Sequence, residues 1–193
     1  MLVSSAHAQT RDSVVYLLAP SSRFEVKTGK AGLMSFAGHE HVIRARSFSG
    51  RIVHVPGAPA FSSVQVTVPT DSLQVMTPPD TAEIRKVTQA MRQDVLDVEH
   101  FPEIRLASRS VTATANGLRI LTQLTMHGQS RDVPVEMRVQ VRGDTLFASG
   151  TFSVKQTDFG MTPFRGGPGG TVRVADRVDF TIEAVGMRES KAR

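Results

Sequence analysis

The chain has 193 residues, which is enough for one ordinary domain and short for two. Hydrophobic residues make up 40% and charged residues 21%, the balance of a globular protein, and no stretch approaches the roughly 20 apolar residues of a membrane-spanning helix. The absence of cysteine excludes disulfides, thiolate metal centres and a cysteine nucleophile. The formal charge is +5, but the basic residues are scattered, so we expect a solvated basic surface and no nucleic-acid partner.

Residues 1–20 are assigned to an N-terminal segment outside the domain. The run Ala6-His7-Ala8 before Gln9 has the small-x-small form of a signal-peptidase site, although the charged and apolar parts of a signal are missing. Two interpretations stay open, a remnant of an export signal and a chance match in a three-residue pattern. We favour the first, which predicts a periplasmic or secreted protein whose mature chain begins at Gln9.

Period-two alternation of apolar and polar residues dominates the rest of the chain and predicts strands with one buried face. Turn residues, Asn116-Gly117 and Gly143-Asp144, separate some of these strands as hairpins. The apolar sets of the clearest strands are Val64, Val66 and Val68; Val133, Val135, Met137, Val139 and Val141; Leu146, Ala148, Gly150, Phe152 and Val154; and Val172, Val174, Val178, Phe180 and Ile182. Shorter strands are expected at 24–28, 43–55 with a bend at Gly50, 104–108 and 118–126.

One segment has helical rather than strand periodicity. Ile84, Val87, Met91 and Val95 recur at the spacing of one helix face. Asp80, with a glutamate three residues later, has the form of a capping box, so the sequence predicts one short helix.

About eight sequential strands with one apolar face each close either as a two-sheet sandwich or as a barrel, and alternation alone does not choose between them. An eight-stranded barrel has an interior wide enough for one small or extended ligand. Because the chain has no tryptophan and one tyrosine, such an interior would be lined by aliphatic and phenylalanine side chains with few hydrogen-bonding groups.

Four segments carry a family resemblance in matching order and spacing: 36–50 (FAGHEHVIRARSFSG), 94–108 (DVLDVEHFPEIRLAS), 124–135 (LTMHGQSRDVPV) and 150–160 (GTFSVKQTDFG). They resemble the YceI-like domain family, and the likeness extends over most of a domain that we bound at residues 21–187, with a tail at 188–193. The resemblance implies an all-β, lipocalin-like antiparallel barrel that is exported, binds a polyisoprenoid or other long-chain amphiphile, possesses no established catalytic activity, and transports or stores its ligand.

The predicted ligand-binding residues combine the inward strand positions with polar groups of the motifs. They are Phe36, Phe48, Val66, Val139, Phe152, Phe159, His39, His41, His127, Lys155 and Asp158. The sequence departs from the family in having His100 where a tyrosine commonly precedes the proline, and in its His39-Glu40-His41 cluster, so the ligand's identity stays open. Peripheral membrane contact and a homodimer are compatible with this interpretation.

His39 and His41 are also the candidate divalent-metal ligands, because residues two apart on a strand face the same side. A third ligand is needed, and His100, His127, Glu99 and Asp158 are its candidates. The alternative is that Gly38-His39 lies in a turn and His41 is a hydrogen-bonded residue at the barrel mouth.

His127 lies off the apolar phase of its strand, before Gly128, which favours a structural hydrogen bond over contact with a ligand headgroup. Lys155, Asp158 and Arg165 flank the glycine-rich stretch 166–170 and are either contacts for an anionic headgroup or solvated charges.

No nucleophile elbow, Walker loop or dinucleotide fingerprint occurs, so we predict a binding protein and not an enzyme. The alternatives are a histidine-based metal-binding or redox-associated exported protein and a bare interaction module. An apolar cavity, a histidine cluster and a filled core distinguish the three.

Overall fold

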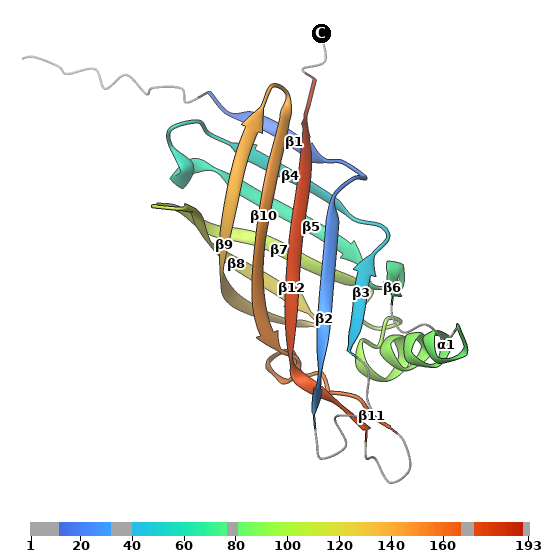
Figure 1. Cartoon of the computed structure of the whole chain (residues 1–193). Helices are drawn as coiled ribbons and strands as arrows, with labels where there is room; N and C mark the ends of the chain where they lie inside the picture. The colour runs from blue at the N-terminus through green and yellow to red at the C-terminus, as the bar shows by residue number, and fades with distance from the viewer. Residues whose placement is uncertain (1–11, 32–39, 77–80, 167–171, 191–193) are drawn as a thin grey trace, which may run out of the picture.

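The computed structural model of the chain describes residues 12–31, 40–76, 81–166 and 172–190, and Figure 1 shows an elongated barrel of strands with one helix at its lower end. The strands are β1 Val14–Leu18, β2 Arg23–Ala31, β3 His41–Ala45, β4 Ser49–His54, β5 Ser63–Pro69, β6 Leu73–Val75, β7 Glu103–Thr114, β8 Gly117–Met126, β9 Gln129–Arg142, β10 Thr145–Lys155, β11 Arg165–Gly166 and β12 Val172–Arg188. The helical elements are α1 Thr81–Ala90, a π turn η4 Met91–Val95, and the 3-10 turns η2 Pro59–Phe61, η3 Thr70–Ser72 and η5 Gln156–Phe159.

The strands form one antiparallel sheet that closes on itself. Eight strands make the ring in the order β1-β4-β5-β7-β8-β9-β10-β12, and β1 pairs again with β12 to complete it. The long strand β12 pairs with β1 near its C-terminal end and with β2 over the rest, and β2 continues the sheet to β3 and β6. The predicted all-β barrel with one short helix is confirmed. No helix among the described residues is long and apolar enough to span a membrane.

The alternation of the sequence sets which side chains point inward. Along β9 and β10 the buried and exposed positions alternate, and Val135, Leu146 and Phe152 are 2%, 1% and 8% exposed. The two predicted hairpin turns join β7 to β8 and β9 to β10, where Gly143 adopts φ 56°, a left-handed conformation that glycine reaches without steric cost. The barrel therefore follows from period-two patterning and turn chemistry.

The structure differs from the sequence prediction at several strands. Segment 14–18, which the prediction set outside the domain, is β1, and its Tyr16 is 3% exposed against Gly186. The predicted strand 43–55 is two strands, since β3 pairs with β2 and β6 whereas β4 pairs with β1 and β5. Strand β7 is longer than predicted: after a register shift between Ser108 and Ser110 it continues to Thr114, still paired with β8.

The predicted helix is also modified. It spans α1 and then widens into the π turn η4, which buries Met91 at 6% exposure against the barrel. The predicted cap at Asp80 lies outside the described residues.

The two ends of the barrel differ. We call the end that bears the β9–β10 turn the hairpin end, and the end that bears α1, η5 and β11 the helix end; they are at the top and bottom of Figure 1. At the helix end, Phe159 from η5 is 1% exposed and belongs to a cluster with Met126 and Met161. Helical turns and large side chains thus close this end.

Candidate functional site

The barrel interior contains two adjoining cavities. The hairpin-end cavity has a volume of about 80 Å³ and the helix-end cavity about 60 Å³. Four residues line both cavities and form a waist between them: Phe24, Val66, Leu106 and Ile182. The two cavities therefore form one interrupted tunnel along the barrel.

Small side chains on two neighbouring strands create the hairpin-end cavity. Ala148 of β10 is the direct partner of Ala184 of β12, and both line the cavity. Further along the same two strands, Phe152 is paired with Phe180, and their rings stack at 4.6 Å with an interplanar angle of 6°. The tunnel thus opens where the paired residues are alanines and ends on a pair of phenylalanines.

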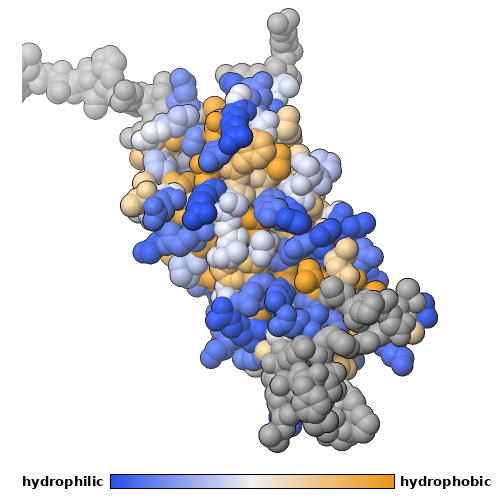
Figure 2. Space-filling view, in the orientation of Figure 1, coloured by the Kyte–Doolittle hydropathy of each residue, from blue (hydrophilic) through white to orange (hydrophobic). Residues whose placement is uncertain are grey.

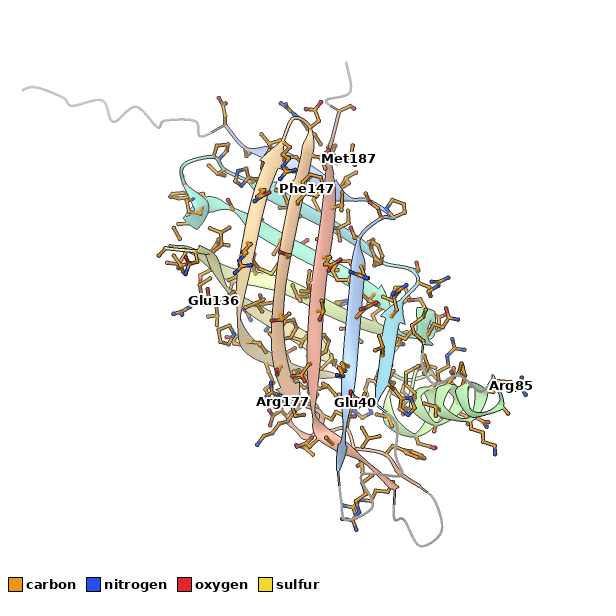
Figure 3. The ribbon with its side chains drawn as sticks, in the orientation of Figure 1. Glu40, Arg85, Glu136, Phe147, Arg177 and Met187 are labelled. Atoms are coloured by element: carbon orange, nitrogen blue, oxygen red, sulfur yellow. The ribbon has the colours of Figure 1, made fainter. Side chains whose placement is uncertain are left out.

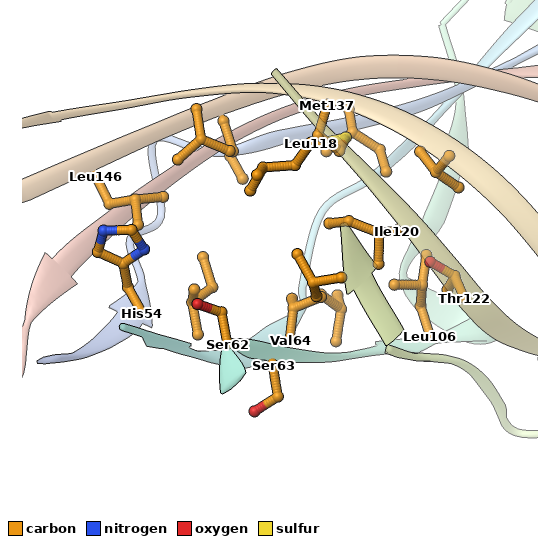
Figure 4. A pocket seen from close by; sticks show the side chains of 18 of the residues that line it. His54, Ser62, Ser63, Val64, Leu106, Leu118, Ile120, Thr122, Met137 and Leu146 are labelled. Carbon is orange, nitrogen blue, oxygen red and sulfur yellow. The ribbon is translucent and has the colours of Figure 1, made fainter. Parts of the chain in front are cut away.

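The lining of the hairpin-end cavity is aliphatic apart from a few polar groups. Figure 4 shows His54 beside Leu146 at one end of the pocket and Thr122 at the other. Ser62 lies next to His54, and its Oγ accepts a hydrogen bond from the backbone N–H of Val55 at 3.0 Å. The tunnel is thus mostly apolar, with His54 and Ser62 at its hairpin end.

His54 is the ionisable side chain that lines this cavity. Burial of the ring lowers its pKa below the usual value near 6.5, because removal from water disfavours the charged imidazolium. The imidazole is therefore neutral at pH 7, with one nitrogen that donates and one that accepts hydrogen bonds.

Comparison with known proteins identifies the family that has this architecture. The family model described as the YceI-like domain matches residues 16–186, nearly the whole barrel. The chain belongs to the YceI-like domain family. The resemblance seen in the sequence is therefore confirmed, and the family match starts within β1.

Solved structures share the fold of this YceI-like domain. BcnA of Burkholderia cenocepacia has a TM-score of 0.64 at 20% identity, covering 84% of this chain and 95% of BcnA. A polyisoprenoid binding domain from Saccharophagus degradans has a TM-score of 0.60 at 12% identity, covering 92% and 100%. The YceI protein of Campylobacter jejuni has a TM-score of 0.58 at 15% identity, covering 77% and 85%. The comparison with curated protein sequences gives no match.

Three of the predicted apolar site residues of the YceI-like domain line the tunnel. Val66 lies at the waist, Val139 lines the hairpin-end cavity and Phe152 lines the helix-end cavity. Their contact with a ligand stays a prediction.

Two other predicted apolar residues pack outside the cavities. Phe48 lies between β3 and β4 and contacts Phe24 edge-on, with ring centroids 4.9 Å apart. Phe159 is part of the packed helix-end core. Phe48 packs against Phe24 and the buried cluster around Val66 and can therefore influence the tunnel through these residues, and Phe159 through the packing at the closed end.

The predicted histidine cluster is only partly within the described residues. Phe36 and His39 lie outside them. Glu40 forms an ion pair with Lys27 at 2.7 Å, and half-buried His41 begins β3, where its backbone N–H donates to Thr28 Oγ1 at 3.3 Å. Within the described ranges, no group of three or more histidine, aspartate, glutamate or cysteine side chains is arranged to hold a metal ion. The metal site at His39 and His41 stays a prediction.

His127 occupies the tight turn between β8 and β9. Its φ is 48°, and its ring packs on Phe101 with centroids 4.1 Å apart. The same Phe101 ring fills the position where a side chain on Gly128 would project, so the histidine and glycine of this motif fit one packed turn. His127 thus makes a packing contact with Phe101, and its predicted structural hydrogen bond stays a prediction.

Lys155 and Asp158 are exposed at the helix end and line neither cavity, and Arg165, in β11, is exposed too. Burial acts to raise the pKa of nearby Asp176, but hydrogen bonds from Thr157 and the charge of Lys155 together lower it below its usual value. Their role as headgroup contacts stays a prediction.

Sequence reasoning did not identify His54 or the Ala148–Ala184 pair. The signal for His54 was present, since it shares the inward phase of β4 with Ile52 and is a polar residue in an apolar set. The alanine pair had no such signal, because the register that joins β10 to β12 spans a connection that the sequence does not resolve.

Proposed function

We propose that the barrel binds a long-chain apolar amphiphile of the polyisoprenoid type in its tunnel, and that it transports or stores this ligand without catalysing a reaction. The observation that supports the proposal best is the pair of apolar cavities that meet at the waist. The structural similarity to a polyisoprenoid binding domain agrees with it.

The small cavity volumes imply that side chains must move before a long ligand can enter. Ligand pockets commonly measure about 300–1,000 Å³, whereas these cavities measure about 80 and 60 Å³. A long chain therefore enters only when side chains at the waist, such as Phe24 and Leu106, change rotamer.

Filling the cavity from the alanine pair tests the proposal. Ala148→Leu places three extra carbons in the tunnel, whereas Ser149→Leu adds a comparable side chain at the exposed neighbouring position of the same strand. We expect delipidated wild-type protein and the Ser149→Leu variant to take up geranylgeraniol, measured by calorimetry or competition with a fluorescent fatty acid. Ala148→Leu should bind at least 10-fold more weakly while folding normally. Uptake unchanged by Ala148→Leu would contradict binding in the tunnel.

We also propose that the hairpin end contacts membranes. Leu17, Phe147 and Met187 are 44%, 41% and 48% exposed on the neighbouring strands β1, β10 and β12. Figure 3 places Phe147 and Met187 near this end, and Figure 2 shows hydrophobic area there. Such side chains suit insertion between lipid headgroups.

Vesicle binding tests this contact. We expect sedimentation with phosphatidylglycerol–phosphatidylcholine vesicles to fall in a Phe147→Ser, Met187→Ser variant and to persist in Leu121→Ser, which changes an exposed leucine on β8. A homodimer that disappears in the double variant, with no vesicle binding in wild type, would assign the same surface to self-association.

We further propose a periplasmic or secreted location, supported by the Ala6-His7-Ala8 pattern. Cell fractionation with N-terminal sequencing tests it, and we expect an exported chain that begins at Gln9. A cytosolic protein that retains Met1 would contradict it.

A further inference from the structure

We infer that His54 and Ser62 form the headgroup site of the tunnel, and that they bind a neutral oxygen-containing headgroup, an alcohol or a carbonyl, in preference to a phosphate. The inference rests on the proposed function and specifies which end of the amphiphile faces which end of the barrel.

The position of His54 supports this assignment. It is the last residue of β4, on the face that points into the barrel, and its half-buried ring borders the hairpin-end cavity beside Leu146 (Figure 4). An imidazole at the end of an aliphatic tunnel makes no hydrogen bond with an apolar chain. It can, however, form a hydrogen bond with a polar group at the end of that chain.

Ser62 supplies a second hydrogen-bonding group at the same place. Its oxygen is oriented by the backbone N–H of Val55, as acceptor at 3.0 Å, and its hydroxyl hydrogen can still donate. The neighbouring Ser63 hydroxyl points away from the pocket in Figure 4. His54 and Ser62 thus present a donor and an acceptor at the hairpin end.

The charge of the site selects the headgroup class. No lysine or arginine is among the described residues that line the two cavities. Burial also lowers the pKa of His54, so its ring is neutral at pH 7. Phosphates are bound in proteins chiefly by arginine, lysine and helix N-termini, whereas alcohols and carbonyls need only neutral hydrogen-bonding partners.

The closed end fixes the orientation of the ligand. The tunnel stops at the stacked rings of Phe152 and Phe180, beyond which lies the packed core of the helix end. A headgroup placed there would lose its hydrogen bonds to water without replacement, so the tail points toward the helix end.

Three probes with one C20 isoprenoid chain test the inference: geranylgeraniol, the corresponding hydrocarbon without the hydroxyl, and geranylgeranyl phosphate. For wild type we expect the alcohol to bind about 2- to 10-fold more tightly than the hydrocarbon, the range that one net hydrogen bond provides. The phosphate should bind no more tightly than the alcohol. His54→Leu should reduce the preference for the alcohol, since only Ser62 remains to bond it, and His54→Gln, which keeps a hydrogen-bonding amide, should reduce it less.

NMR of the unmodified protein gives a readout that does not depend on the variants' folding. The His54 ring resonances should shift when geranylgeraniol is added, and those of His100, an exposed residue near the helix end, should not. Equal affinity for alcohol and hydrocarbon, a preference that His54→Leu leaves undiminished, tighter binding of the phosphate, or an unmoved His54 resonance would overturn the headgroup site while leaving binding in the tunnel intact. Failure of all three probes to bind would overturn the proposed function as well.

Discussion

The hairpin-end and helix-end halves of this barrel are built from the same strands by the same alternation, yet the cavity at the hairpin end is larger, about 80 Å³ against about 60 Å³, and packed side chains such as Phe159 close the helix end. On β10 and β12 the inward pair at the hairpin end is Ala148 with Ala184, and the inward pair nearer the helix end is Phe152 with Phe180. Binary patterning decides which residues face inward, and side-chain volume decides whether the enclosed space remains. The hairpin-end cavity therefore results from small residues at a few inward positions of the core.

The two ends of the barrel also differ in what they contribute, to stability or to ligand binding. Protein interiors are packed at high density, and side chains that face empty space lose dispersion contacts. Beyond the tunnel at the helix end, Phe159 and Met161 are 1% and 5% exposed, line neither cavity and belong to the packed core, while the tunnel leaves space along the rest of the barrel. Substitutions in the two halves should consequently affect different properties.

The largest loss of stability is expected when the Phe152–Phe180 stack is broken. Phe152→Ala removes a ring that is 8% exposed and stacked on Phe180, so it should lower the free energy of unfolding by about 3–5 kcal/mol. Urea denaturation measures this, and Phe147→Ala on the same strand, at 41% exposure, is the matched control with an expected loss of about 1 kcal/mol or less. Equal losses for the two variants would show that the Phe152–Phe180 stack does not contribute to the packed core.

A smaller effect on stability and a clear effect on binding are expected from Val139→Gln. This change introduces an amide into the apolar lining of the hairpin-end cavity, where an unpaired polar group costs about 1–3 kcal/mol. Val141→Gln makes the same substitution two residues further along β9, at a position that is 43% exposed. Geranylgeraniol binding should weaken about 10-fold in the first variant and little in the second. If both variants bind as wild type does, Val139 does not contact the ligand.

The smallest expected effects are on the pH dependence of stability, and they come from two histidines whose pKa values are shifted in opposite directions. Burial lowers the pKa of His54, whereas a hydrogen bond to Asp97 at 2.8 Å raises that of exposed His100. The unfolded chain takes up a proton at His54 at higher pH than the folded barrel does, so this residue reduces stability as pH falls below about 6.5. His100 does the reverse: its contribution is complete below about pH 6.5 and is lost as pH rises through its raised pKa.

NMR titration of both imidazoles measures their two pKa values. We expect His54 to titrate below pH 6.5 and His100 above it, and Asp97→Asn should return His100 toward its ordinary value while leaving His54 unchanged. The opposite order of the two midpoints would contradict the burial of His54 in the cavity wall.

The sequence predicted the barrel well because strand periodicity and turn residues are local signals. It placed Val66, Val139 and Phe152 on the inward face, and each lines the tunnel. It left β1 outside the domain, because the pairing of residues 14–18 with β4 and β12 is a long-range property that a short apolar run does not reveal.

The site was less predictable than the fold, for a related reason. The two histidines flanking Glu40 are candidates because of their close spacing, whereas His54 stands alone in the chain and reaches the cavity wall through the strands around it. Whether a buried histidine borders a cavity depends on the volumes of its neighbours across several strands. A single strand's pattern does not contain that information.

The most direct test of the account is mass spectrometry of organic extracts from the purified wild-type protein and from the Ala148→Leu variant. The tunnel predicts a long-chain apolar amphiphile with a neutral alcohol or carbonyl headgroup, present in wild type at near-stoichiometric amount and depleted in the variant. Extracts of wild type without such a lipid, together with no uptake of geranylgeraniol by the same preparation, would contradict the central claim that this barrel is a lipid-binding protein.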